Sequence, residues 1–216
     1  MEYVVVKTQE VNPKINSPEW EKANTGTITQ CSQWNGYFPC PNTTFKMLYS
    51  DAGISILMHT DETHLRAEAT TFQVPVCHDS CMEFFFKPDP YDKRYINFEV
   101  NPIGVMHIGL GSDRYDRVKV TDDRAILDIE SVAKEGDWTI KYFLPYEFLR
   151  RFFNQISPVS RGNFYKCGEK TDHSHTGAWA KVETPVPDFH VPDFFDKIRF
   201  GNGGGEGEDY FKVVRP

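Results

Sequence analysis

The sequence has little of what marks membrane, secreted or nucleic-acid-binding proteins. The apolar run near the N-terminus covers only Tyr3–Val6, and no basic residue precedes it, so we expect neither a signal peptide nor a membrane span there. The formal net charge is -7, from 24 Lys and Arg against 31 Asp and Glu. Nucleic-acid binding normally requires a basic cluster, and the chain has none. We therefore expect no nucleic acid and no membrane as partner, and the sequence leaves the oligomeric state open.

Cysteine is scarce, and the number of cysteines is odd. The five residues are Cys31, Cys40, Cys77, Cys81 and Cys167. Because they cannot all pair within one chain, we expect reduced thiols and a cytoplasmic location. A leader removed upstream would leave the same sequence, and the protein would then be secreted.

Internal repeats and long low-complexity linkers are also missing. We expect a single domain over residues 1–216, with a core over about 15–200 and a glycine-rich loop or tail over 201–216. A chain of 216 residues can bury a sizeable core without disulfides. The glycines of the tail lack the strand-then-helix context of a phosphate-binding loop.

What the sequence does contain is alternation of apolar and polar residues. In Tyr95–Asn101 every second residue is apolar, which is the pattern of a half-buried strand. Cys81–Lys87 alternates in the same way, and the turn formers of KPDPYDKR join the two segments. An antiparallel pair of strands is therefore predicted.

Short, evenly spaced strands predict an all-β fold, an antiparallel β-sandwich of the immunoglobulin or jelly-roll kind. The expected strands are 44–50, 53–59, 65–70, 81–87, 94–101, 105–110, 117–120, 125–132, 138–144, 163–167 and 197–201. The N-terminal segment is expected to be a loop or an edge strand. Short helices should follow the N-cap Ser17 and run from Pro145 to Phe153. The predicted core includes Ile96, Phe98, Val100, Phe84, Trp138 and Ile140.

The polar face of the predicted strand pair is the first candidate site. In register, Glu83 comes near the row formed by Asn97, Glu99 and Asn101. Such a polar face with aromatic neighbours can hold a polyhydroxylated ligand. The alternative is a solvated sheet face, because antiparallel sheets often wet one side.

Several segments, in their order along the chain, resemble the family 9 carbohydrate-binding modules and their standalone relatives. They are PEWEKA, TFKMLYSDAGISILMH, DSCMEFFFKPD, YINFEVNPIG, GDWTIKYFLPYEFL and W-x9-FH-x-P-x-F-F-x-K-I-x-F. The resemblance covers roughly residues 15–200. It implies a β-sandwich that binds a sugar by clamping the ring between two tryptophans, above polar side chains that bond the hydroxyls.

The resemblance also implies roles for particular residues. A hydroxyl-binding acid and an asparagine of the sugar-binding members fall on Glu83 and Asn101, and an arginine position is occupied by Glu99. The second clamp tryptophan aligns with Phe189, whereas the first should lie near residues 75–78, PVCH, which include no aromatic residue. The implied sugar site therefore has one aromatic wall.

A second candidate cluster lies further along the chain. Trp179 and Phe189 supply apolar faces for stacking, and His175 and His190 can donate hydrogen bonds to sugar hydroxyls. The alternative is that Trp179 is a core residue and that the histidines cap loop carbonyl groups.

No zinc site is assigned. Cys77-His78-x-x-Cys81 lacks the second ligand pair of a zinc finger, so we expect buried free cysteines there. His173 and His175 could bind zinc only if the fold placed them on one side, with His190 or Asp188 completing the site.

No cofactor is assigned either, although a structural calcium fits the resemblance. The acidic turn 89–92, with Asp113 and Asp116, offers oxygen ligands. The sequence lacks an ordered calcium-binding loop, so solvated turn carboxylates are expected.

Two functions follow from these patterns. The first is non-catalytic binding of a sugar or glycan end in carbohydrate catabolism. The alternative is a glycan hydrolase that uses Glu83 and Glu99, since glycosidases need two carboxyl groups about 5–9.5 Å apart. The predicted neighbours of these two acids are polar and favour the charged form of both. We therefore assign no catalytic residue.

Overall fold

The computed structural model describes residues 1–30, 34, 36–121 and 124–201, and these residues form thirteen strands. The strands are β1 (Glu2–Lys7), β2 (Gly26–Gln30), β3 (Thr43–Tyr49), β4 (Gly53–Thr60), β5 (Cys81–Lys87), β6 (Tyr95–Val100), β7 (Met106–Gly111), β8 (Arg117–Lys119), β9 (Glu130–Lys134), β10 (Asp137–Pro145), β11 (Val159–Cys167), β12 (Thr176–Ala178) and β13 (Asp196–Phe200). The helical segments are η1 (Pro18–Lys22), η2 (Val76–His78), η3 (Arg124–Leu127), α1 (Tyr146–Leu149) and η4 (Pro192–Phe194). The predicted glycine-rich tail lies outside the described residues, apart from Gly201, as does Cys31.

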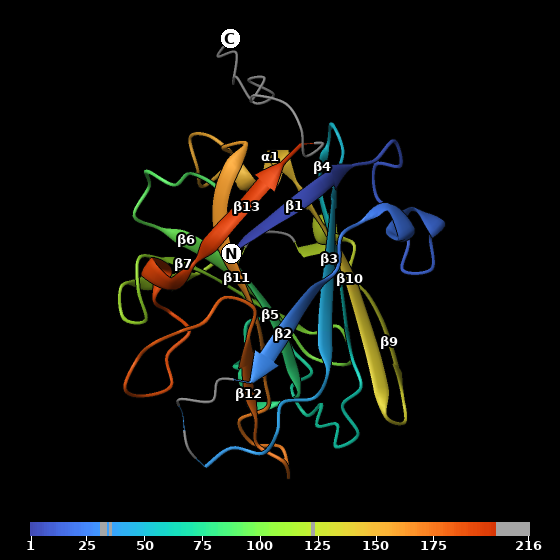
Figure 1. Ribbon diagram of the computed structural model, residues 1–216, viewed down its shortest axis with the longest axis vertical. Coiled ribbons are helices and arrows are strands. Elements are labelled where there is room, and N and C mark those ends of the chain that lie inside the picture. The colour runs from blue at the N-terminus through green and yellow to red at the C-terminus, as the bar shows by residue number, and fades with distance from the viewer. Residues whose placement is uncertain (31–33, 35, 122–123, 202–216) are drawn as a thin grey trace.

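The strands form two layers that pack face to face (Figure 1). The first layer has the order β8-β7-β6-β5-β11-β12, the second has the order β2-β3-β4-β10-β9, and β12 pairs with β2 to join them. This arrangement confirms the predicted β-sandwich. One prediction is wrong: β1 is not an edge strand, because it pairs in parallel with both β13 and β3.

The main core lies between the two layers, and strand alternation explains it. The inward residues of β5 and β6, such as Phe84 and Phe98, face β10 residues such as Trp138 in one apolar cluster. All six residues predicted for the core are fully buried: Ile96, Phe98, Val100, Phe84, Trp138 and Ile140. The core prediction is therefore confirmed.

The segment 65–70 is not a strand, because side chains rather than a neighbouring strand satisfy its backbone. The Arg66 N–H donates to Ser80 Oγ, and the N–H groups of Glu68 and Ala69 donate to the two carboxylate oxygens of Asp79. Asp79 and Ser80 immediately precede β5. The segment is thus tied to the end of β5 without joining a sheet.

Two further element predictions differ from the structure, and two strands were not predicted. The expected strand 125–132 is split by Asp128, whose φ of 42° turns the backbone between η3 and β9. The expected helix from Pro145 is a single turn, α1, although Phe148 and Leu149 close one end of the main core as predicted. The short strands β2 and β12, which join the layers, had no alternating pattern long enough to predict them.

The outer face of the first layer, turned away from the main core, is also buried. Every residue of β6 is buried, and Phe85, Tyr95 and Tyr165 form a second apolar cluster with Trp34. We call residues 182–195, which contribute Val182, Phe189 and Phe195 to this cluster, the covering segment. The predicted alternative of a solvated sheet face is wrong, because the covering segment packs on these aromatic side chains and excludes water from them.

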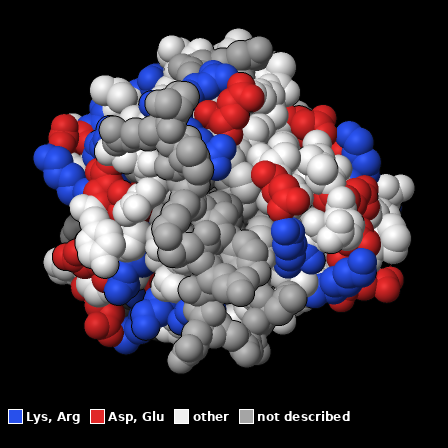
Figure 2. All heavy atoms as spheres, turned by 90° about the horizontal axis from the view of Figure 1, so that it is seen from above, with Lys and Arg blue, Asp and Glu red and all other residues white. Residues whose placement is uncertain are grey.

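The molecular surface carries both signs of charge. Viewed from the end that carries α1, acidic and basic side chains alternate over the described residues (Figure 2). None of the helices in the described part of the chain is long and apolar enough to cross a membrane.

Candidate functional site

Two carboxyl groups face each other at the centre of the outer face. The register of β5 and β6 places Glu83 directly opposite Glu99, as the predicted strand pair required. Tyr165 of β11 lies beside Glu83, and His107 of β7 lies beside Glu99. We call these four residues the carboxyl row. Glu83 is 2% and Glu99 is 7% exposed.

The carboxyl row has few hydrogen-bond partners. The Asn97 amide donates to Glu99 Oε1 at 2.7 Å, and the Cys167 thiol donates to Glu83 Oε1 at 2.9 Å. Nδ1 of His107 is buried without a partner. Within the described part of the chain, no Lys or Arg forms an ion pair with either acid. The carboxyl oxygens of the row and Nδ1 of His107 can therefore form further hydrogen bonds with a ligand.

Burial sets the electrostatics of the row. Burial raises the pKa of Glu83 to about 7, and burial together with the Glu83 charge raises the pKa of Glu99 well above its usual value. The expectation that polar neighbours keep both acids charged is wrong. The reason is the covering segment, which removes water from a face that the sequence pattern alone leaves open.

The covering segment closes the row with an aromatic ring. Phe189 stacks on Tyr165 with ring centroids 4.1 Å apart and planes 12° apart. Phe189 also packs into a third apolar cluster, which contains Val76 and Cys77. The two walls of the implied clamp, residues 75–78 and Phe189, thus meet above the row. A sugar ring between them would have to displace Phe189.

Arg117 is a residue of this face that no motif or spacing in the sequence indicated. Its guanidinium group reaches from β8 over Gly109, where a Cβ would clash with it, and donates to Asn97 Oδ1 and His190. The Tyr95 hydroxyl lies 2.8 Å from His190 Nδ1. Burial and the Arg117 charge lower the pKa of His190 to about 2, so the ring is neutral. The predicted site residue His190 therefore does lie near the carboxyl row.

Two predicted site residues have structural roles instead. Asn101 Oδ1 accepts from the Val105 N–H, and Asn101 Nδ2 donates to Ala69 O and Asp79 Oδ2, all within 3.0 Å. Trp179 packs in the main core, as the alternative interpretation of that residue expected. Its ring is therefore not available as a wall for the carboxyl row.

His175 belongs to a different place, a buried charged network at the end of the sandwich. Lys166 Nζ lies 2.9 Å from Glu62 Oε2 and 2.7 Å from His175 Nε2. Trp138 Nε1 and Ser80 Oγ donate to Glu62 at 3.1 Å and 2.8 Å. Burial and the Lys166 charge lower the pKa of His175 to about 4. His190 lies instead beside Tyr95 and Arg117, and among the described residues the groups of possible metal ligands include neither His175 nor His190.

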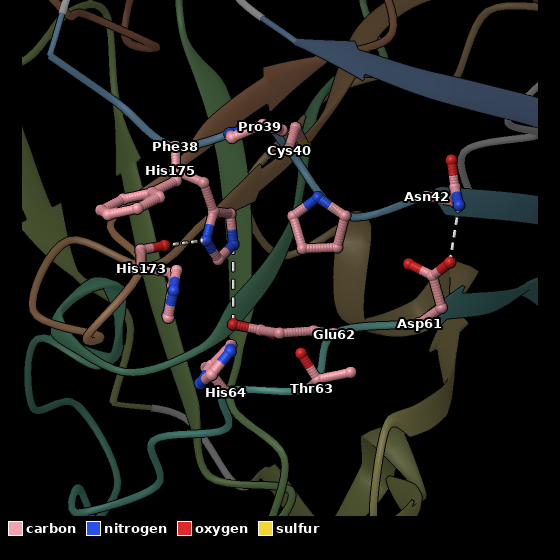
Figure 3. A pocket seen from close by; sticks show the side chains of 11 residues that line it. Phe38, Pro39, Cys40, Asn42, Asp61, Glu62, Thr63, His64, His173 and His175 are labelled. Carbon is pink, nitrogen blue, oxygen red and sulfur yellow. Dashed lines mark hydrogen bonds and ion pairs between the residues drawn. The ribbon is translucent and has the colours of Figure 1, made fainter.

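An open pocket of about 470 Å³ adjoins this network (Figure 3). Glu62 and His175 form its floor, and the half-exposed ring of Phe38 lies edge-on to His173 at 4.5 Å. The His64 and His173 rings stack at 3.7 Å. Other polar groups of the pocket are Asn42 and Asp61. An aromatic ring beside planar polar groups also suits a sugar, so this pocket competes with the carboxyl row as a binding place.

The acidic turns are occupied by internal hydrogen bonds. Asp89 Oδ1 accepts from the Tyr91 N–H and from Gln155, and Asp113 Oδ1 accepts from two backbone N–H groups. Among the described residues, the groups of three or more metal-ligand side chains include none of these aspartates. The expectation of turn carboxylates without an assigned calcium stays a prediction.

Comparison with known proteins places the fold. The model of carbohydrate-binding family 9 matches residues 14–200. A crystal structure from Bacteroides uniformis ATCC 8492, of a protein assigned rather than shown to bind carbohydrate, is 24% identical, with a TM-score of 0.78, covering 93% of this chain and 99% of that one. A family 9 module from Caldicellulosiruptor kristjanssonii in complex with glucose is 10% identical, with a TM-score of 0.64, covering 97% of this chain and 100% of the module.

A structure of a family 9 module from Caldicellulosiruptor kristjanssonii in complex with cellotriose is also 10% identical, with a TM-score of 0.64, and the match covers 100% of both chains. A search of curated proteins found no match. The fold thus defines a β-sandwich of the carbohydrate-binding-module class. The chain belongs to carbohydrate-binding family 9, which confirms the resemblance drawn from its motifs.

Proposed function

We propose that this protein binds a carbohydrate without transforming it, and that the sugar lies on the carboxyl row beneath Phe189. The observation that carries the proposal is the row itself. Two carboxyl groups face each other with unused acceptor capacity, beside a buried His107 nitrogen without a partner and beneath an aromatic ring. Sugar hydroxyls are donors that such groups recognise, and aromatic faces stack on sugar C–H groups.

Family membership supports the ligand class. Glu83 and Glu99 occupy strand positions that the family resemblance links to sugar binding, and the related modules hold glucose and cellotriose. We therefore propose glucose or the end of a glucose-containing glycan as ligand, with a role in carbohydrate catabolism. Because Glu99 replaces a cationic donor with an acceptor, the ligand must supply hydroxyl donors at that position.

Binding requires the covering segment to open. Opening must break the contacts that hold the segment: Tyr165 OH donates to Phe189 O at 3.2 Å, Trp34 Nε1 donates to Thr184 O at 3.0 Å, and Arg114 forms an ion pair with Asp188 at 2.9 Å. The contacts of His190 with Tyr95 and Arg117 must break as well. Residues 185–187 of the segment are exposed. Opening separates Phe189 from Tyr165, and the sugar then takes the place between them. Opening and a one-walled clamp both reduce affinity. We therefore expect a dissociation constant in the high micromolar to millimolar range, which corresponds to a binding free energy of about -4 to -6 kcal/mol.

The first experiment is a glycan array followed by calorimetry with glucose and cellotriose. Phe189→Ala should weaken binding about fivefold or more, because the aromatic contact contributes about 1 kcal/mol. Phe38→Ala, in the pocket of Figure 3, is the matched control and should bind as the wild type does. The reverse result, with Phe38→Ala weakened and Phe189→Ala unchanged, would move the sugar to that pocket.

A hydrolase is the second candidate, favoured by the raised pKa of Glu83. A carboxylic acid that keeps its proton near neutral pH can protonate a leaving group. Hydrolysis also requires a second acid that stays ionised, whereas the pKa of Glu99 is raised as well. Both pKa values are raised above the ordinary carboxyl range, so burial holds neither acid firmly ionised at neutral pH as a nucleophile or base requires. Turnover of aryl glycosides or oligosaccharides that disappears in a folded Glu83→Gln variant would favour the hydrolase instead.

A further inference from the structure

Three cysteines gather beside the carboxyl row, two of them four residues apart and the third distant in the sequence. Cys81 of β5 and Cys167 of β11 are direct cross-strand partners, and Glu83 lies two residues further along β5. The ligand atoms of these three residues lie within 4.8 Å of one another, and all three side chains are buried. Cys167 Sγ lies 2.9 Å from Glu83 Oε1.

The third thiol comes from the turn before β5. Cys77 packs into the same apolar cluster as Cys81 and Cys167, and its carbonyl oxygen accepts from the Cys167 thiol at 3.7 Å. Cys77 is also part of a second group, in which its thiol, His78 and Glu169 lie within 4.8 Å of one another. Backbone hydrogen bonds from Glu169 and Lys170 to the carbonyls of Cys77 and His78 hold the two segments together.

We infer that Cys77, Cys81 and Cys167, with one oxygen of Glu83, form a binding site for a thiophilic divalent cation, with Zn²⁺ as the best fit. Three sulfur atoms and one oxygen match the tetrahedral sites that zinc prefers. Zinc binds sulfur at about 2.3 Å and oxygen at about 2.0–2.2 Å. The ligand atoms of Cys81, Cys167 and Glu83 already lie within 4.8 Å of one another, and the Cys77 side chain must turn away from its group with His78 and Glu169 to become the fourth ligand. Binding displaces the thiol protons into solvent, so the metal replaces them as the partner of each sulfur.

The surroundings favour a cation at this position. The three cysteines pack among Val76, Val105 and Ala69, and within the described residues no Lys or Arg forms an ion pair with Glu83. A divalent cation would offset two of the four negative charges that three thiolates and a carboxylate carry, and the Lys166 ammonium, which donates to the Cys167 carbonyl oxygen at 2.9 Å, lies beside the remaining charge. His78 and Glu169 are more exposed than the inner ligands and offer an entry path from solvent. Calcium does not fit, because it requires oxygen ligands.

This inference goes beyond the proposed carbohydrate binding and does not depend on it. Glu83 has two oxygens, and only Oε1 faces Cys167. The second oxygen can still accept a hydroxyl. A metal bound to Oε1 would hold the Glu83 side chain in place at the floor of the sugar site.

The test uses the full chain, reduced, freed of metal with a chelator and titrated with Zn²⁺ or Co²⁺ in the absence of sugar. We expect one equivalent of bound metal and a thiolate-to-cobalt charge-transfer band in the near ultraviolet. Cys81→Ser and Cys167→Ser should each lose the band and reduce metal affinity at least tenfold. Cys40→Ser, a thiol of the pocket in Figure 3, is the matched control and should keep both.

Two results would overturn the inference. One is a wild-type protein in which a thiol reagent modifies every cysteine and in which added Co²⁺ produces no thiolate-to-cobalt band. The other is equal metal binding in wild type and in Cys81→Ser, with circular dichroism confirming that the variant is folded. Calorimetry with cellotriose on the metal-free and metal-loaded wild type is run separately. A protein that binds metal but no sugar, or sugar but no metal, then distinguishes failure of one proposal from failure of the other.

Discussion

At the scale of single residues, Glu99 carries the clearest conflict between stability and binding. Its side chain is almost completely buried, and its one direct partner in the described structure is the Asn97 amide. Because burial raises the pKa of Glu99, folding at pH 7 must either protonate this acid or bury its charge. Both cost free energy. The burial of Glu99 therefore costs stability, and the sugar site proposed above gives this acid a role other than stability.

Glu99→Gln should separate the two effects. Glutamine keeps an oxygen that accepts from Asn97 but cannot ionise, so we expect the free energy of unfolding at pH 7 to rise by about 1 kcal/mol. Sugar affinity should fall about tenfold, since hydroxyls donate more strongly to a carboxylate than to an amide. Urea denaturation and calorimetry measure the two quantities. A variant that is less stable and binds normally would contradict this account.

At the scale of elements, the network of Lys166, Glu62 and His175 ties the two layers together. Lys166 belongs to β11 of the first layer, and Glu62 follows β4 of the second. Trp138 of β10 donates to Glu62 and lies beside the Lys166 ammonium, which is 5.7 Å from its ring centroid. Lys166 is fully buried. Each charge is therefore tolerated only because its partner is present.

A double-mutant cycle tests this coupling. Glu62→Gln leaves the Lys166 charge buried without its counterion, so we expect a loss of about 3–5 kcal/mol in the free energy of unfolding. Lys166→Met with Glu62→Gln should recover most of that loss, because no buried charge is then left alone. The exposed pair Lys181–Glu183 provides the control, and Glu183→Gln there should leave the free energy of unfolding essentially unchanged, because solvent screens exposed pairs. Additive losses in the cycle would show that the two residues are not coupled.

At the scale of the whole molecule, the buried network of Lys166, Glu62 and His175 should make the free energy of unfolding depend on pH. His175 lies there among Lys166, Glu62 and the His173 carbonyl, and its pKa is lowered to about 4. The folded protein therefore keeps this ring neutral. The corresponding stability is fully present above the unfolded pKa of about 6.5 and is lost as the pH falls from there towards 4.

Comparison with His175→Gln isolates this contribution, since glutamine does not titrate. The stability difference between wild type and variant should fall by up to about 3 kcal/mol between pH 7 and pH 4, because a shift of one pKa unit corresponds to about 1.4 kcal/mol. Urea denaturation at several pH values measures the difference. A difference that stays constant with pH would mean that His175 is not held neutral in the folded state.

Much of the fold could be predicted because strand alternation is a local property. Ile96, Phe98 and Val100 must share one side of a strand whatever surrounds it, and all three lie in the main core. The order of the motifs was likewise enough to place the chain in its family. Elements without a local pattern, such as β12, could not be predicted, since their pairing depends on strands distant in the sequence.

By itself, the sequence determined which residues of β5 and β6 share a face, and hence that Glu83 meets Glu99. Only the tertiary structure decided what that face meets. The covering segment buries the two acids and raises the pKa of both, and Cys167 reaches Glu83 across 84 residues of chain. The physical reason is that alternation fixes the direction of a side chain within its own strand, whereas burial, charge compensation and ligand sets depend on every segment that packs against it.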